Sequence, residues 1–181
     1  MPPGLLLFLQ HVGLALRLHS TMPVDPLEAV MHVQAAIEAS TDQISPEVLL
    51  AIAYVESRYE PLALSRIEGK KRKLGMYLPD EPPKNWKQGT SLHCGPLQTY
   101  ALTWDECLGM RRSLHTAYAA GAKQLSTWLR DRRVRGDLTR ALAGYGCGNH
   151  GVKTGKCNRY PGRVLWQARR IASSLPARGR A

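Results

Sequence analysis

The sequence predicts a mainly α-helical domain, built as a bundle of helices around one central buried helix, with a small irregular or β-hairpin excursion. Two proline-containing helix-start signals, Asp25-Pro26 and Ser45-Pro46, each precede an apolar stretch. Apolar residues recur at helical spacing along most of the remaining chain. Residues 65–95, which are basic and rich in proline and glycine, break this pattern. A chain of 181 residues that is 44% hydrophobic is long enough for one domain with a substantial core.

The first two expected helices follow these start signals. The first covers residues 25–39 and is amphipathic, with an apolar face predicted from Leu27, Val30, Met31, Gln34 and Ile37. The second opens at Ser45 and ends at Glu56 or Ser57. Because the second is apolar on nearly all sides, we expect it in the centre of the core.

The downstream elements complete the expected domain, which spans residues 25–175. Prolines and glycines predict an excursion with little regular structure over residues 66–94, placed to line one wall of a cleft. Helices are expected over residues 99–108, 114–129 and 138–145, then a glycine-rich loop over 144–162 and a last helix over 163–175. A stripe that we assign to the core consists of Ala117, Gly121, Leu125 and Trp128.

Two segments flank this domain, an apolar N-terminal segment over residues 1–24 and a basic tail over residues 176–181. Polar residues interrupt the apolar stretch 5–18, which is too short to span a bilayer, so no transmembrane span is expected. It lacks the basic start of a signal peptide, and we expect no cleaved leader. Its helical spacing predicts docking against the body of the protein or against a partner protein.

The net charge predicts an anionic partner. Lysine and arginine number 25 against 14 aspartate and glutamate, which gives a formal charge of +11. Nucleic acid, acidic membranes and the bacterial cell wall all carry the opposite sign. No nucleic-acid motif is visible, and aromatic residues are not interleaved with the basic ones, so nucleic acid is not the expected partner.

The cysteines form an even set of four, Cys94, Cys107, Cys147 and Cys157. Four cysteines permit three pairings, and the even number favours an exported or extracellular setting. Short loops suggest the pairs Cys94 with Cys107 and Cys147 with Cys157, each worth roughly 2–3 kcal/mol if formed. The alternatives are free buried thiols, or a zinc site with His93 and His150 as extra ligands, although the spacings match no common zinc motif.

Glu56 is the candidate for acid–base chemistry, because it closes the buried helix that begins at Pro46. Desolvation by neighbours such as Ile52 and Val55 would disfavour the ionised carboxylate and raise its pKa, as protonation of a leaving-group oxygen requires. A solvated glutamate at a helix end is the alternative. The downstream motifs favour the catalytic interpretation.

Four pieces of sequence resemble, in order, the lytic transglycosylase and goose-type lysozyme families of the lysozyme-like superfamily. They are the Glu56-Ser57 helix end with an aromatic residue after it, residues 95–98 (Gly-Pro-Leu-Gln), residues 117–125 with their small-Gly-Ala pattern, and residues 141–148 around Tyr145. A looser match around Tyr160 is similar to the families' closing segment. Gly146 departs from the pattern, because it stands where these families usually have asparagine.

The resemblance implies a lysozyme-like fold and an enzyme that cleaves the β-1,4 bond between N-acetylmuramic acid and N-acetylglucosamine in peptidoglycan. Glu56 falls on the catalytic acid. The positions implied to bind the glycan are Ser57, Gly95, Leu97, Gln98, Tyr145 and Tyr160. No cofactor is expected. The enzyme would act on the periplasmic or extracellular side of the bacterial cell wall.

The number of carboxylates separates two outcomes of this cleavage. Most glycosidases use two, whereas the resemblance to lytic transglycosylases implies one, which acts first as acid and then as base and gives 1,6-anhydro products. The transglycosylase outcome is the expectation, and lysozyme-type hydrolysis is its alternative. Candidates for a second carboxylate are Glu60, Glu68, Asp80, Glu81, Asp105 and Glu106.

Two interpretations compete with the enzyme. A wall-active protein without a leader is typical of a phage, either as a virion-associated enzyme or an endolysin, or it belongs to a secretion machine. In the first competing interpretation the domain is a structural virion or assembly component, docked to partner proteins through the N-terminal segment. In the second the chain is a basic nucleic-acid-binding protein.

Overall fold

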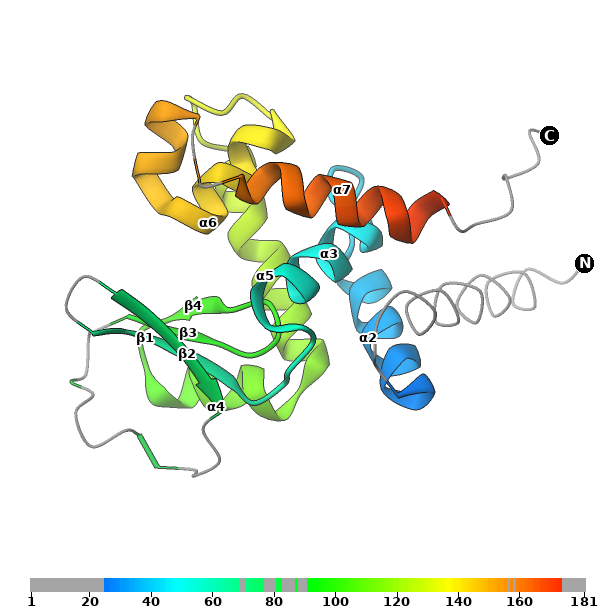
Figure 1. Cartoon of the computed structure of the whole chain (residues 1–181), viewed down its shortest axis with the longest axis vertical. Coiled ribbons are helices and arrows are strands. Elements are labelled where there is room, and N and C mark those ends of the chain that lie inside the picture. Colours follow the sequence, from blue (N-terminus) through cyan, green and yellow to red (C-terminus); the bar gives the residue numbers. More distant parts are fainter. Residues whose placement is uncertain are drawn as a thin grey trace, which may run out of the picture.

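The fold is mainly helical with a small antiparallel sheet, as the sequence predicts (Figure 1). The computed structural model describes residues 25–68, 71–76, 81–82, 87, 91–155, 157 and 159–173. The expected N-terminal docking segment 1–24 and the tail 176–181 therefore lie outside the described residues. The described elements are α2 (Pro26–Ala39), α3 (Pro46–Ser57), β1 (Ala63–Glu68), β2 (Lys71–Met76), β3 (Leu92–Cys94), β4 (Thr99–Ala101), α4 (Trp104–Arg112), α5 (Leu114–Leu129), α6 (Leu138–Thr154) and α7 (Tyr160–Ser173).

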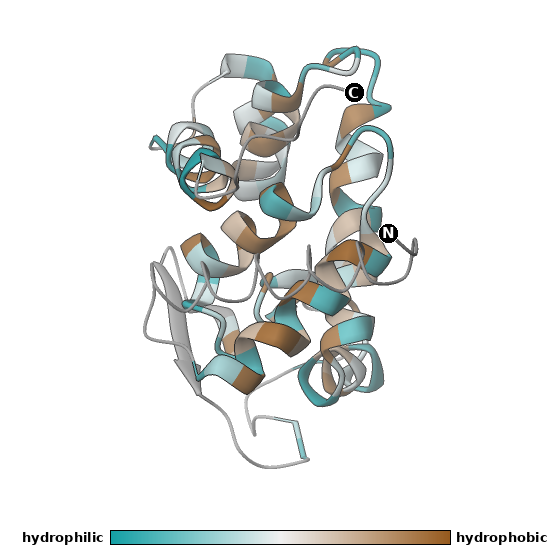
Figure 2. Cartoon of the chain, turned by 90° about the vertical axis from the view of Figure 1, so that its right-hand side faces the viewer, coloured by the Kyte–Doolittle hydropathy of each residue, from teal (hydrophilic) through white to brown (hydrophobic). Residues whose placement is uncertain are grey.

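Helix α3 forms the centre of the core, which confirms the prediction from its apolar composition. Its side chains from Val48 to Ala53 are buried, and α2, α5 and α7 pack around it. Pro46 stands in the first turn, and the helix ends where Arg58 adopts a left-handed backbone conformation with φ 62°. In Figure 2 hydrophobic and hydrophilic residues alternate along the surrounding helices, as amphipathic helices require.

Helix α2 begins and ends as predicted, but it buries a different face. Asp25 caps the helix by accepting a hydrogen bond from the Leu27 N–H at 2.9 Å. The predicted apolar stripe is largely outside the core, because Leu27 is 68% exposed and Met31 is 52% exposed. The core-facing side consists instead of Ala29, His32, Val33, Ala35 and Ala36. The small residues on this side let α2 approach α5 closely. The prediction followed the larger apolar residues instead and therefore chose the wrong face.

The expected irregular excursion contains a regular sheet. Strands β1 and β2 form an antiparallel hairpin, and the sheet has the order β2-β1-β3-β4. The hairpin is the second of the two forms expected for this segment, whereas the prediction of little regular structure is wrong for these residues. Strand β4 also corrects the helix expected over residues 99–108. That helix begins at Trp104, because the Thr103 hydroxyl and the Glu106 carboxylate form a reciprocal capping box there.

Of the two glycine-containing helices α5 and α6, the first was predicted correctly and the second was not. Helix α5 has the expected bounds. The prediction of a loop over residues 144–162 is wrong, because α6 continues to Thr154 with a kink at Gly148 (φ 57°, ψ −147°), and α7 begins at Tyr160. Gly144 and Gly146, upstream of the kink, lie within this helix, and their neighbours leave no room for a side chain there.

The two disulfides join local segments, and they are the pairs that short loops favoured. Cys94 is bonded to Cys107, which links β3 to α4, and Cys147 is bonded to Cys157, which links α6 to the segment before α7. No free cysteine remains. All four sulfurs are therefore unavailable as thiolate ligands for zinc.

Candidate active site

The centre of the candidate site is the tight turn formed by residues 95–98, which joins β3 to β4. The Gly95 N–H donates to the carbonyl of Ala63 at 2.9 Å, which fixes the turn to β1. The Gln98 N–H donates to the Gly95 carbonyl at 3.0 Å, and Gln98 itself has φ 50°. A non-glycine residue in the left-handed region persists only where its surroundings determine the conformation. The turn is therefore a rigid part of the molecule.

Ser57 connects the end of α3 to this turn. Its hydroxyl donates to the Pro96 carbonyl at 2.8 Å and lies 3.3 Å from the Ala53 carbonyl, within its own helix. The hydroxyl is buried, so a lost partner would not be replaced by water. The contact sets the position of the last turn of α3, which carries Glu56, relative to residues 95–98.

Tyr145 connects α6 to the other side of the same turn. Its hydroxyl donates to the Leu97 carbonyl at 2.9 Å, and it lies 3.4 Å from the hydroxyl of Thr99. All three residues are buried. Tyr145 therefore supports the turn from α6, while Ser57 supports it from α3.

Two close approaches bring the remaining motifs to the same place. A Cβ atom added at Gly121, in α5, would lie 2.4 Å from Cδ2 of Leu97. One added at Gly146, in α6, would lie 2.8 Å from the ring of Tyr160. Such distances are shorter than a van der Waals contact, so these positions require the absence of a side chain. The four motifs therefore meet around residues 95–98, and the closing segment packs against the fourth motif at Gly146.

Glu56 lies half-buried in the last turn of α3. Its neighbours Tyr54 and Arg58 form a cation–π pair, with the guanidinium carbon 3.9 Å from the ring centroid. Arg58 has φ 62°, and the buried Tyr59 after it has φ 70°. These two consecutive left-handed residues reverse the chain two residues after Glu56. This reversal gives the end of α3 a defined direction.

Gln98 and Leu97 are less accessible than a sugar-binding role suggests. Gln98 is only 1% exposed, and its side-chain Nε2 donates to the Gly95 carbonyl at 2.9 Å. The Leu97 side chain is fully buried against α5. In this structure both residues hold the turn together. Tyr160 is half-buried at the start of α7, where its ring covers Gly146.

A cleft of about 980 Å³ borders the turn on the side of Thr99 and Tyr145. Helices α4, α5 and α6 and strands β3 and β4 supply its walls, which include Tyr100, Leu102, Glu106, Lys123, Gln124, Trp128, residues 144–148 and Asn149. Trp128 packs against the core, as the sequence predicts, and its half-buried side chain also lines this cleft. Glu56 is not among the residues that line this cleft.

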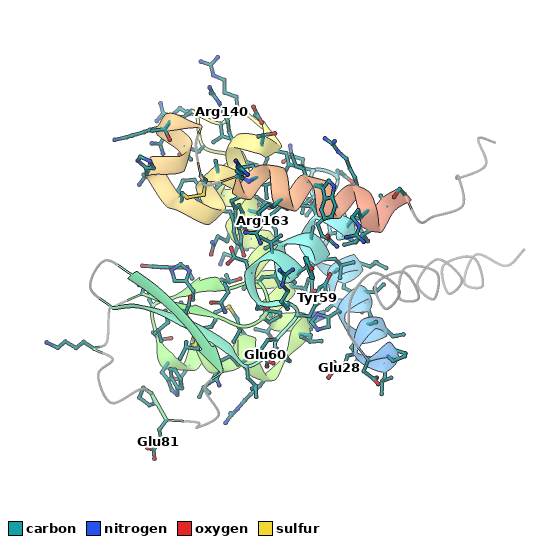
Figure 3. All side chains as sticks on the ribbon, in the orientation of Figure 1. Glu28, Tyr59, Glu60, Glu81, Arg140 and Arg163 are labelled. Atoms are coloured by element: carbon teal, nitrogen blue, oxygen red, sulfur yellow. A yellow bond between two sulfur atoms is a disulfide. The ribbon has the colours of Figure 1, made fainter. Side chains whose placement is uncertain are left out.

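The described candidates for a second carboxylate are engaged elsewhere or exposed. Glu106 lines the cleft, but its Oε2 accepts hydrogen bonds from the N–H groups of Leu102 and Thr103, which lower the pKa of the carboxyl. Glu60 accepts from the Leu62 N–H, and Asp105 is exposed on α4. Figure 3 shows Glu81 at the outer end of the excursion, away from Tyr59. The side chains of Glu68 and Asp80 lie outside the described residues.

A buried polar cluster beside α3 was missed from the sequence. His32, which is 2% exposed, places Nδ1 2.9 Å from the Tyr118 hydroxyl and hydrogen-bonds the backbone of Tyr59. Burial lowers the pKa of His32 to about 4, and the bond to Tyr59 opposes this in part. Burial also raises the pKa of both tyrosines well above the usual value, so their hydroxyls stay protonated. The sequence signal for this cluster was a single histidine among the small apolar residues of one face of α2.

Comparisons with known proteins leave the family open. No protein family matches the chain, no curated protein is significantly similar to it, and no solved structure matches it. Within the described ranges, no helix is long and apolar enough to cross a membrane. The same part of the chain holds no group of three or more histidine, cysteine or acidic side chains arranged for a metal ion. The function therefore has to be argued from the geometry of the site.

Proposed function

We propose that this protein is a peptidoglycan-cleaving enzyme of the lysozyme-like superfamily, with Glu56 as its acid. The observation that supports the proposal most strongly is the meeting of four motifs at residues 95–98. Ser57 reaches the turn from α3, Gly121 from α5 and Tyr145 from α6. Segments far apart in sequence meet in this way when they build one site. A chance resemblance of four short motifs would not require them to touch.

In the proposed reaction the Glu56 carboxylic acid protonates the oxygen that links N-acetylmuramic acid to N-acetylglucosamine. The C–O bond at the muramic acid breaks with assistance from its N-acetyl group, and N-acetylglucosamine leaves with the proton. Glu56, now a carboxylate, removes the proton of the muramic 6-hydroxyl, whose oxygen then closes the 1,6-anhydro ring. The protons balance, and no water is consumed.

The distribution of carboxylates favours this transglycosylase reaction over hydrolysis. Hydrolysis with inversion needs a second carboxylate about 6.5–9.5 Å from the acid. Glu106 and Glu60 are already committed to backbone N–H groups, and Glu81 points away from the end of α3. Lysozyme-type hydrolysis on the same bond remains the second candidate, because Glu106 is an ionised carboxylate in the wall of the cleft.

The remaining assignments follow from the site. The glycan strand would lie along the cleft and cross residues 95–98 to reach Glu56, with Tyr145 and Tyr160 beside its path. Ser57, Gly95, Leu97 and Gln98 would hold the shape of the turn. The enzyme would act on the bacterial cell wall, and its positive charge would attract it to that anionic surface. A phage or secretion-machine origin, with docking through residues 1–24, belongs to the same proposal.

The test is the clearing of a peptidoglycan suspension by the purified protein and by Glu56→Gln. We expect wild-type protein to clear the suspension and Glu56→Gln to lose at least about 100-fold in rate, the usual contribution of general acid catalysis. Glu60→Gln is the matched control, because Glu60 lies four residues further along the chain, beyond the end of α3, and accepts a local hydrogen bond from the Leu62 N–H. Equal clearing by Glu56→Gln and wild type would refute the proposal.

A further inference from the structure

An arginine-rich loop projects beside one end of the cleft. This segment, residues 130–140, connects α5 to α6 and includes the first turn of α6. It contains five arginines against two aspartates: Arg130, Arg132, Arg133, Arg135, Arg140, Asp131 and Asp137. We call it the arginine loop. The formal charge of these residues is +3. The cleft lining, by contrast, includes one lysine and one glutamate, Lys123 and Glu106, whose charges have opposite signs. The loop is therefore a local concentration of positive charge.

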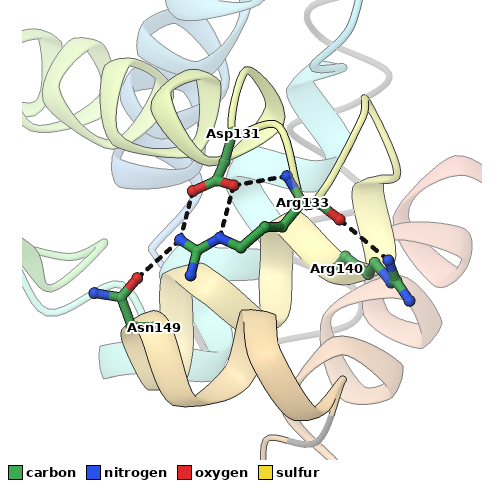
Figure 4. Close-up of polar contacts among 4 residues, drawn as sticks. All are labelled: Asp131, Arg133, Arg140 and Asn149. Atoms are coloured by element: carbon green, nitrogen blue, oxygen red, sulfur yellow. Dashed lines mark hydrogen bonds and ion pairs between the residues drawn. The ribbon is translucent and has the colours of Figure 1, made fainter.

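Two of the arginines give the loop a fixed shape. Arg133 donates through Nε and Nη2 to the Asp131 carboxylate at 2.9 and 2.6 Å, and its Nη2 also donates to Oδ1 of Asn149 (Figure 4). Arg140 donates to the Arg133 carbonyl at 3.1 Å. The hydrogen bonds from Arg133 lower the pKa of Asp131 to about 2, so this carboxylate stays ionised at neutral pH. The side chain of Val134 is buried in the hydrophobic core, which fixes the middle of the loop to the body of the protein.

The other three arginines are available for a ligand. Arg130, Arg132 and Arg135 are exposed, and none of them makes a hydrogen bond or ion pair through its side chain with any residue that the structure describes. Arg135 has φ 52°, a left-handed conformation that a β-carbon disfavours. A loop that is held in shape while three guanidinium groups face solvent is suited to binding anions. Because the loop backbone is already fixed, binding costs conformational freedom mainly in the arginine side chains.

The arginine loop is attached to the cleft at two points. It begins directly after α5, and the Asp131 N–H donates to the carbonyl of Trp128, a lining residue, at 3.0 Å. Asn149, which accepts from Arg133, is also a lining residue. The arginine loop therefore lies beside the part of the cleft that Trp128 and Asn149 line.

We infer that Arg130, Arg132 and Arg135 bind the carboxylates of the peptide stems that the glycan carries. The inference rests on the proposed function. In peptidoglycan every muramic acid bears a peptide stem with free carboxylates, so these groups accompany any glycan strand that lies in the cleft. The planar guanidinium fork matches a carboxylate with two parallel hydrogen bonds. The arginine loop would thus favour stem-bearing strands over bare ones.

The test measures binding separately from cleavage. Peptidoglycan free of phosphate polymers is prepared with its stems and, after amidase treatment, without them. Sedimentation of both with protein in the Glu56→Gln background gives dissociation constants. R132Q/R135Q removes two of the three guanidinium groups and leaves Arg130, which caps α5. R169Q/R170Q on α7 is the charge control, because it also removes two exposed charges, of which Arg170 stacks on Trp166 outside the loop.

We expect R132Q/R135Q to weaken binding to stem-bearing peptidoglycan by about five-fold, as two exposed charge contacts allow, and to leave binding to stripped glycan within about two-fold. R169Q/R170Q should match the parent on both. Equal weakening on the two substrates, or none on either, would overturn the inference while leaving the proposed function intact. Failure of the parent protein to bind either substrate would instead contradict the proposed function.

Discussion

The Ser57 hydroxyl donates a 2.8 Å hydrogen bond to the Pro96 carbonyl, across 39 residues of sequence. This bond joins the helix that carries Glu56 to the turn on which the other motifs converge. Both residues are buried, so the bond is shielded from water. The position of the proposed acid thus depends on a contact made by the residue beside it.

Ser57→Ala should therefore reduce activity more than its effect on stability explains. Loss of the buried bond leaves the Pro96 carbonyl without this donor, which should cost about 1–3 kcal/mol in the free energy of unfolding. Urea denaturation measures that cost, and the clearing rate below the unfolding transition measures activity. Ser173→Ala is the control, since the exposed Ser173 hydroxyl donates to the Arg170 carbonyl within its own helix, α7. Unaltered activity in a folded Ser57→Ala would show that the contact is not needed to position Glu56.

Gly146→Ala should destabilise the protein, because the added Cβ would lie 2.8 Å from the Tyr160 ring and 3.1 Å from the Cys157 sulfur. Overpacking of this kind costs about 1–3 kcal/mol. Gly162→Ala is the matched control: an added Cβ meets nothing within 4 Å, and alanine in a helix should stabilise by about 0.5–1 kcal/mol. Thermal unfolding of both variants measures the difference. A Gly146→Ala protein as stable as wild type would contradict the packing of α7 against α6.

Stability should fall as the pH is lowered from about 6.5 to 4, because of His32. Its pKa is about 4 in the folded protein against 6.5 as the ordinary value, so the unfolded chain binds the proton more readily in this range. The stability is complete above pH 6.5, and roughly 3 kcal/mol is lost by pH 4. Denaturation of wild type and His32→Gln at several pH values measures this dependence.

The slope between pH 6.5 and 4 should be smaller in His32→Gln, whatever its absolute stability. His115→Gln serves as the control, because His115 is exposed and paired with the exposed Glu38. It should retain the wild-type slope. An identical pH dependence in His32→Gln and wild type would mean that His32 does not titrate in this way.

Periodicity predicted the helices whose ends carry strong local signals, but not which side of each helix faces the core. Asp25 and Pro46 mark the starts of α2 and α3 as the structure has them. In α2 the pattern of large apolar residues pointed to Leu27 and Met31, which are exposed. The choice of face depends on how closely α5 can approach, and that is a tertiary property absent from the local pattern.

The candidate site was predicted as a set of residues, but its connections were not. The sequence contains a capping-box pattern at Thr103 and Glu106, which marks the true start of α4 and which the prediction of a helix from residue 99 did not use. The glycines of α6 looked like a loop, since their close contacts with other helices are not encoded locally. Gln98 was expected to face the sugar, and its burial within the turn depends on the fold around it.

The most direct test of a single-carboxylate mechanism at Glu56 is mass spectrometry of the products of peptidoglycan digestion in water labelled with heavy oxygen. The account predicts 1,6-anhydro muropeptides without label from wild-type protein and no products above background from Glu56→Gln. Reducing ends that carry the label would show that water, and not the muramic 6-hydroxyl, attacks the glycan. Products of any kind from a correctly folded Glu56→Gln would contradict the central role of this residue.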